Sequence, residues 1–368
     1  MLTSLLLIDI ASTFGVPVGV MGQINTPFYV VAVIFALFMG VLSVRFRHKS
    51  LLMAGLLSVT ISASGCFFAS NFNLMLTTYA LSGVGTAMVT PMAITLIGEH
   101  LPLEKRTSAI GWIVASGALS YVIGAPVIGF IAELGGWRLV LLGFALPASL
   151  TGLLLAFIGL PRTSHRHEPA ISKRAYLGSF TEVLSNSSAT ACLMGNTLRS
   201  IAFMVILLYG ISFFREQFAV STGFASLVML GAAASYTLGS LVCGRFANRV
   251  GRKPATVSTS FMGGLLAIAF AYLPNLWLSL ALNFLAAWFF GMGASAANSL
   301  TLEQVPKFRG TMMSLTSAAQ SLGSALGATL GGSLLVLYNY RIMGSALGAL
   351  GIVAAIVFYF LSVDPTRP

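Results

Sequence analysis

One charged residue, Arg199, lies inside a long apolar segment where an ionisable group is costly. It is about ten residues into the segment 189–214, so a helix rising ~1.5 Å per residue would place it near the middle of a bilayer. A charge at that depth costs at least ~2.5–3.5 kcal/mol and needs a wet cavity or a polar partner. Asn196 and Phe203 share its helix face. We predict that this face lines a substrate pathway; the alternative is that Arg199 bonds backbone carbonyls of a neighbouring helix.

Uncharged side chains with hydrogen-bonding groups in other apolar segments extend this candidate substrate cavity. They are Tyr79, Tyr121, Tyr236, Asn283, Asn298 and Gln320. A neutral polar residue in such a segment more often bonds a neighbouring helix than a ligand, so both roles stay open for each of them.

The acidic residues are informative because none of the nine lies inside a predicted membrane span. A carboxylate within the membrane commonly carries protons or balances a cationic solute, so this distribution favours a neutral or an anionic solute. Asp9 is a peripheral candidate if protons are the coupling ion. The spans contain no histidine, and the sequence has no clustered carboxylates, nucleophile elbow or phosphate-binding loop. We therefore expect no enzyme, no metal and no cofactor.

The composition places these residues in a membrane protein. Of the 368 residues, 57% are hydrophobic and 8% are charged, against about 25% charged in an average soluble domain. A soluble fold of this size could not bury so much apolar surface and still cover itself with polar groups. The net charge of +11 would suggest a nucleic-acid partner in a soluble protein. Here the basic residues stand in short connections between apolar segments, so we expect a lipid bilayer and no nucleic acid.

Eleven segments are long and apolar enough to cross a bilayer, which takes about 20 residues. They are 26–44, 51–70, 75–97, 107–132, 139–160, 189–214, 223–244, 255–273, 276–299, 310–336 and 342–362. Residues 2–10 form an apolar stub that is too short to span. Sixteen Lys and Arg residues lie in alternate connections and the tail, and the other connections hold only Arg138, Arg215 and Arg341. The positive-inside rule therefore predicts a multi-pass cell-membrane protein with a cytoplasmic C-terminus.

Two basic connections match each other at an offset of 204 residues. GVLSVRFRHK (40–49) aligns with GRFANRVGRK (244–253), and the pair GVGTAM (83–88) and GMGASA (291–296) follows in the same order. Such matches predict two homologous halves, as in parallel-repeat transporters. The expected organisation is an N-terminal bundle (1–160), a cytoplasmic linker (161–188) and a C-terminal bundle (189–368).

These motifs resemble the major facilitator superfamily, particularly its drug and arabinose efflux branch. The family's first signature reads roughly G-x-x-x-D-R-x-G-R-[RK]. GRFANRVGRK matches it well, with Asn248 at the acidic position, and GVLSVRFRHK matches it less well, with Val44 and Arg47 replacing the acid and the glycine. VPKFRGTMMSLTSAAQSLGSALGATLGG (305–332) resembles the family's eleventh helix, and GAPVIG (124–129) resembles the Gly-Pro signature of its fifth.

The resemblance implies an all-α polytopic membrane protein with two six-helix bundles, a central cavity and alternating access. The first helix is expected to be truncated, since IASTFGVPVGVMGQI (10–24) resembles the loop that follows it, and an Arg often found in the fourth helix is Tyr79 here. We expect a monomeric secondary active transporter in the inner membrane that exports a small amphipathic solute such as a drug, sugar or metabolite. The alternative is a truncated, non-transporting membrane protein with a scaffold or regulatory role.

The resemblance also assigns gating and hinge residues. The gating loops would use Gly40, Arg45, Lys49, Gly244, Asn248, Arg249, Gly251, Arg252 and Lys253. Arg45 and Arg249 are expected to bond helix C-termini or acids across the cytoplasmic face, although topology alone could explain their charge. The hinge residues would be Gly124, Pro126 and Gly129, because proline favours a kink and glycine admits close helix contact; ordinary packing is the alternative.

Overall fold

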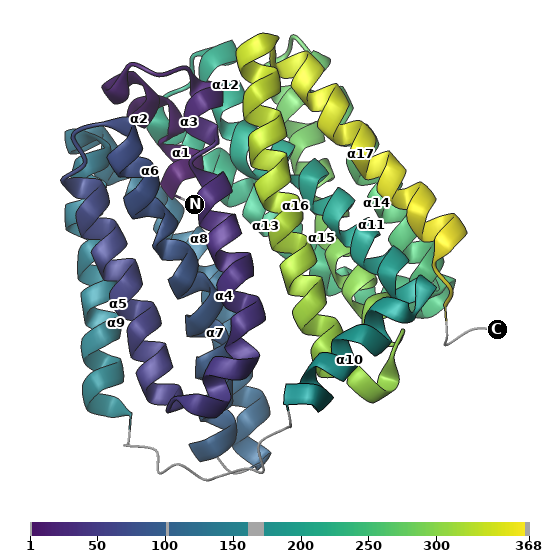
Figure 1. The fold of residues 1–368 in the computed structure, drawn as a ribbon. Coiled ribbons are helices and arrows are strands. Elements are labelled where there is room, and N and C mark those ends of the chain that lie inside the picture. The colour runs from purple at the N-terminus through teal and green to yellow at the C-terminus, as the bar shows by residue number, and fades with distance from the viewer. Residues whose placement is uncertain (1, 101–102, 161–172, 365–368) are drawn as a thin grey trace.

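The computed structural model describes residues 2–100, 103–160 and 173–364, and these residues are helical with no strand (Figure 1). Within these described ranges, ten stretches are long and apolar enough to cross a membrane. One of them, the 40-residue stretch Ser120–Gly159, covers the second half of the predicted span 107–132 and nearly all of the span 139–160, and it is broken between them at Gly135 and Gly136. The predicted fold class, a polytopic membrane protein with two helical bundles, is confirmed.

The N-terminal bundle lies on the purple and blue side of Figure 1. Its helices are α4 (Asn25–Arg45), α5 (His48–Phe67), α6 (Phe72–Ala80), α7 (Ser82–His100), α8 (Leu103–Val140), the π-helical turn η1 (Leu141–Ala145) and α9 (Leu146–Gly159). α6 and α7 together form one candidate span. Gly136 ends the first arm of α8 with φ +74°, a conformation that glycine adopts without the steric cost of a Cβ atom.

The C-terminal bundle lies on the green and yellow side of Figure 1, and a linker helix, α10 (Lys173–Ser185), leads into it. Its elements are α11 (Ser187–Met204), η2 (Val205–Tyr209), α12 (Gly210–Phe218), α13 (Thr222–Val250), α14 (Arg252–Ala269), η3 (Phe270–Tyr272), α15 (Leu276–Leu302), η4 (Pro306–Phe308), α16 (Arg309–Leu337) and α17 (Tyr340–Leu361). The two matching basic connections join α4 to α5 and α13 to α14, at equivalent places in the halves. We call the end that holds them the basic end, and the other end the opposite end.

Residues 2–22 form three short helices, α1 (Leu2–Leu5), α2 (Leu7–Phe14) and α3 (Val18–Gly22). The prediction of a loop over residues 10–24 is wrong in part, because α3 is helical and begins the candidate span Val18–Met39. The apolar stub is too short to span, as predicted, but it is buried between the bundles. Its side chains Leu5, Leu6, Leu7 and Ile10 are fully buried, since apolar groups gain free energy when they leave water.

Backbone geometry at one glycine of the basic end generates a stability prediction. Gly251 joins α13 to α14 with φ +111° and ψ +154°, a region that other residues enter only at a cost of about 1–3 kcal/mol. Gly251→Ala should therefore lower the thermal unfolding midpoint in detergent. The matched control is Gly244→Ala, because Gly244 is helical and a Cβ added there meets no atom within 4 Å. This control should be neutral or stabilising by up to about 1 kcal/mol, and equal midpoints for the two variants would contradict the prediction.

Candidate functional site

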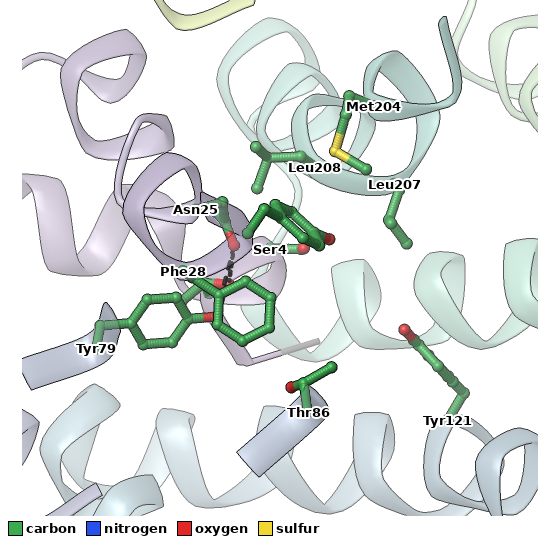
Figure 2. A pocket seen from close by; sticks show the side chains of 11 residues that line it. Ser4, Asn25, Phe28, Tyr79, Thr86, Tyr121, Met204, Leu207 and Leu208 are labelled. Atoms are coloured by element: carbon green, nitrogen blue, oxygen red, sulfur yellow. Dashed lines mark hydrogen bonds between the residues drawn. The ribbon is translucent and has the colours of Figure 1, made fainter. Parts of the chain in front are cut away.

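A cavity of about 230 Å³ lies between the halves, where the N-terminal segment meets both bundles (Figure 2). Helix α1, four helices of the N-terminal bundle (α4, α6, α7 and α8), and α11 and η2 of the C-terminal bundle supply its walls. The lining residues are Thr3, Ser4, Asn25, Phe28, Tyr29, Tyr79, Thr86, Tyr121, Met204, Leu207 and Leu208. None of these side chains is acidic or basic, so the walls offer hydroxyl, amide and aromatic groups.

Three polar side chains form a hydrogen-bonded cluster in this wall. The Tyr79 hydroxyl lies 3.2 Å from the Thr3 hydroxyl and donates to the Asn25 side-chain oxygen at 3.5 Å. Thr3 also donates to that oxygen at 3.4 Å, and the Asn25 amide donates to the Gly22 carbonyl at 3.4 Å. The cluster joins α1 to α4 and α6. Tyr79 is therefore held in place by neutral partners.

An ion pair joins the halves above this cavity, at the opposite end. Arg215 at the end of α12 donates to both carboxylate oxygens of Asp9 in α2, at 2.5 and 2.9 Å. It also donates to the Leu5 carbonyl at 3.2 Å. The Arg215 and Asp9 side chains are 12% and 32% exposed. Planar, two-point contacts of this kind are the stronger class of charge-assisted hydrogen bond. We call this pair with its Leu5 contact the Asp9–Arg215 clasp.

Close backbone contact closes the same end between α3 and α16. A Cβ atom added at Gly19 would overlap the Gly332 carbonyl oxygen, and one added at Gly332 would overlap the Gly19 carbonyl oxygen. Beside them, the hydroxyls of Thr26 and Thr329 lie 2.7 Å apart. On the other flank, the Glu133 carboxylate of α8 accepts from the Gly223 backbone N–H of α13 at 2.6 Å.

The gating residues at the basic end contact their own half wherever the structure describes them. Lys49 donates to the Phe157 carbonyl at 2.9 Å and to the Leu160 carbonyl, at the C-terminus of α9, where the helix dipole favours a cation. An ion pair of 3.5 Å joins Arg252 to Glu303, and the Lys253 backbone N–H donates to Asp364. Arg249 is exposed. The side-chain environments at Gly40, Arg45 and Asn248 lie outside the described part.

The predicted cavity residues divide between two places. Tyr79 and Tyr121 line the cavity between the halves. Asn196, Asn298 and Gln320 instead bond one another inside the C-terminal bundle: the Gln320 amide donates to Asn298 at 3.0 Å and to Asn196 at 3.4 Å. Asn196 also donates to Thr301 at 3.2 Å. This second group is a helix–helix network, the alternative that the sequence left open. Asn283 is 2% exposed, in α15.

Arg199 lies in the interior of the C-terminal bundle and is 4% exposed. Its guanidinium donates to the Phe290 carbonyl at 3.5 Å, a long hydrogen bond, and interacts with the Tyr236 hydroxyl. The buried Nε atom has no hydrogen-bond partner among the described residues. Phe203 packs against both Tyr236 and Phe290, with ring centroids 5.2 and 5.3 Å apart. The structure therefore shows the backbone-carbonyl contact, and a contact of Arg199 with substrate stays a prediction.

The predicted hinge residues lie in the regular part of α8. Pro126 is within the helix, and the backbone leaves helical geometry only at Gly135 and Gly136. Gly129 faces α13 of the other half, where an added Cβ would lie 2.7 Å from the Ser226 Cβ. Gly129 therefore provides close contact between the halves, and hinge motion at this site stays a prediction.

Sequence reasoning missed most of the cavity wall. Thr3 and Ser4 stand in the apolar stub, which was predicted only to be too short to span, and Thr86 lies in the predicted span 75–97 but was not named as a cavity residue. A usable signal exists for α4: Asn25, Phe28 and Tyr29 follow one another at i, i+3 and i+4, which places them on one helix face. This spacing identifies a shared helix face, but the sequence alone does not show which neighbouring helix that face contacts.

The family comparison accounts for both halves of this architecture. The family model described as Major Facilitator Superfamily matches residues 1–214 and again residues 193–368. The chain belongs to the Major Facilitator Superfamily. It is thus a multi-pass membrane protein of a transporter family whose members act on small-molecule substrates.

Curated relatives of this superfamily member include several bacterial transporters. It is 23% identical over 358 residues to the uncharacterized MFS-type transporter YwfA of Bacillus subtilis, covering 96% of this chain and 87% of that protein. It is 24% identical over 365 residues to a probable sugar efflux transporter of Pasteurella multocida, covering 97% and 86%. Solved structures with the same fold include a mutant of the nucleoside transporter NupG, with a TM-score of 0.79 at 16% identity and coverage of 98% and 96%. The D-xylose-proton symporter gives 0.78 at 16% identity, with coverage of 99% and 94%.

We predict opposite effects on stability for substitutions of two buried or partly buried arginines of this superfamily member, Arg199 and Arg215. Arg199→Met should leave the stability unchanged or raise it, because the guanidinium is desolvated and has one long hydrogen bond. Even a buried ion pair can often be replaced by well-packed apolar side chains with no loss, or with a gain of about 1–4 kcal/mol, and Arg199 has a weaker partner than an ion pair would provide. Arg215→Met is the matched control and should destabilise, because it leaves Asp9 without its cation. Thermal unfolding of both variants in detergent checks this, and a large loss of stability in Arg199→Met would show that the guanidinium is well paired.

Proposed function

We propose that this protein is a secondary active transporter that exports a small, uncharged or anionic amphipathic solute across the inner membrane by alternating access. The observation that carries the proposal is the asymmetry of the contacts between the halves. Among the described residues, the hydrogen bonds that join the two halves gather at the opposite end, and the cavity lined by both halves lies beneath them. A closed end above a shared cavity is one of the two states that alternating access requires.

The orientation follows from charge. Sixteen of the 20 Lys and Arg residues fall in the connections and tail of one side, which the positive-inside rule assigns to the cytoplasm. On this assignment the C-terminus is cytoplasmic, and the Asp9–Arg215 clasp closes the outward side. The state described here then faces the cytoplasm, the side from which an exporter loads its solute. We propose that the protein acts as a monomer, since each half already buries its partner surface in the other.

We propose that an ion gradient drives the transport, with protons as the candidate ion. Asp9 is engaged by Arg215 across the halves, and protonation of Asp9 would remove the charge that Arg215 binds. The names of the relatives support export of small solutes: one is a probable sugar efflux transporter and another is multidrug resistance protein 2 of Bacillus subtilis.

Flux through proteoliposomes tests the proposal. The purified protein is reconstituted, a pH gradient of either sign is imposed, and uptake of a panel of sugars, drugs and nucleosides is measured against protein-free vesicles. We expect saturable flux of at least one uncharged or anionic solute that reverses with the gradient. Correctly folded protein that gives no flux with any panel member would favour the alternative of a non-transporting membrane protein.

The clasp generates a prediction about the closed end. Asp9→Asn and Arg215→Gln should each favour opening outward, because each leaves one partly buried group without its charged partner. We expect faster labelling of a cysteine at position 86 in the cavity, in Thr86→Cys protein, by an impermeant maleimide added from outside. The charge-swapped double variant Asp9→Arg, Arg215→Asp should recover part of the protection.

An exposed pair provides the control for this experiment. Lys307 and Glu182 lie 3.7 Å apart with side chains 75% and 53% exposed, where an ion pair contributes little. Lys307→Gln should leave the labelling rate unchanged. Protection that is the same in wild type, Asp9→Asn and Arg215→Gln would contradict a gating role for the clasp.

A further inference from the structure

We propose that the cavity between the halves selects a small uncharged solute that carries several hydroxyl groups on a compact ring, with the chemistry of a monosaccharide or a cyclic polyol. This inference rests on the transport function proposed above and assigns the class of solute. Three properties of the wall lead to it: its charge, its hydroxyl groups and its size.

The wall excludes charged solutes because it holds no counter-charge. The eleven lining residues include no Asp, Glu, Lys, Arg or His. The nearby charges Asp9 and Arg215 are already paired with each other. An ionised solute would therefore lose its hydration and gain no opposite charge, a cost that neutral hydrogen bonds do not offset.

The hydroxyl groups of the wall indicate a solute that donates and accepts hydrogen bonds at more than one edge. Ser4 in α1 and Tyr121 in α8 line the cavity from different elements (Figure 2), and neither hydroxyl has a hydrogen-bond partner among the described residues. Thr86 donates to the Ser82 carbonyl at 3.2 Å, which leaves its oxygen free to accept. A site with such groups loses free energy when an apolar ligand covers them, and therefore favours a ligand with matching hydroxyls.

The volume of the cavity and the aromatic rings in its wall narrow the class of solute further. A volume of about 230 Å³ is below the ~300–1,000 Å³ typical of pockets for drug-sized ligands, so the solute is smaller than a typical drug. Phe28 packs against Tyr29 and Tyr79 with ring centroids 4.8 and 5.5 Å apart, forming an aromatic wall. Such a wall suits the apolar C–H face of a small ring, while the hydroxyls of Ser4, Thr86 and Tyr121 are available to bond its edges.

Binding to the purified full-length protein in lipid nanodiscs tests the assignment. The probes are hexoses, pentoses and inositol, the amino and carboxylate counterparts of the hexoses, and cyclohexanol as a ring with one hydroxyl. We expect at least one neutral polyol to bind about tenfold or more tighter than its charged counterparts and than cyclohexanol. Tighter binding of a charged counterpart or of cyclohexanol, or no binding of any neutral polyol, would overturn the assignment.

Conservative variants connect the binding to this wall. Tyr121→Phe and Ser4→Ala each remove one unpartnered hydroxyl and should weaken the neutral solute by about threefold to tenfold. Tyr338→Phe is the control, because Tyr338 is 60% exposed and remote from the cavity lining. Thermal unfolding midpoints confirm that the variants fold. Unchanged affinity in both Tyr121→Phe and Ser4→Ala would overturn the proposal.

A substitution that adds a charge to the wall tests the assignment through a gain of affinity, whereas Tyr121→Phe and Ser4→Ala test it through a loss. Thr86→Asp places a carboxylate on an exposed part of the wall and should raise the affinity for the amino counterpart about tenfold over wild type. Flux measurements separate this inference from the proposed function. Flux of charged or lipophilic solutes alone would overturn the polyol assignment but leave the transport function supported. Binding of a polyol without any flux would support the polyol assignment but count against the transport function.

Discussion

The direct meeting of two backbones at the opposite end is the constraint on which the rest of the structure depends. Gly19 and Gly332 leave no room for a side chain at this contact, and close approach of helices is how membrane proteins gain packing without a hydrophobic force between them. The contact holds the halves together at one end of the molecule, next to the cavity that both halves line. The Glu133–Gly223 hydrogen bond and the Asp9–Arg215 clasp then hold the two sides of this interface, whose centre is the close packing of the two glycine backbones.

Most of the polar groups described above have a hydrogen-bond partner, although the Ser4 and Tyr121 hydroxyls at the cavity have none among the described residues. The amides of the C-terminal bundle bond one another, and Thr3, Asn25 and Tyr79 do the same beside the cavity. Arg199 departs from this rule, since its Nε atom is buried with no hydrogen-bond partner among the described residues. A buried cation that is only weakly bonded costs stability.

The fold could be predicted from the sequence because it depends on properties that are summed over many residues. Apolar length, alternation of basic loops and the repeat at an offset of 204 residues identified the spans and the two halves. The cavity was predicted less well, because it depends on which helix faces meet. Tyr79 and Tyr121 were found as polar groups within spans, but Thr3 and Ser4 become wall residues only because the bundles enclose a segment too short to span. Asn196 and Gln320 carry the same signal, yet they bond each other.

The contact of Arg215 with the Leu5 carbonyl has a thermodynamic consequence. Leu5 ends the same four-residue helix that presents Thr3 and Ser4 to the cavity, so one short helix both contacts the Asp9–Arg215 clasp and forms part of the cavity wall. In the proposed transport cycle, a movement that withdraws Arg215 would free that helix from this contact, and a solute bound to the Thr3 and Ser4 hydroxyls would then be held by fewer groups. By linkage, occupancy strengthens the clasp to the same extent that breaking the clasp weakens occupancy. Release of the bound molecule would in this way be built into the same step that exposes it.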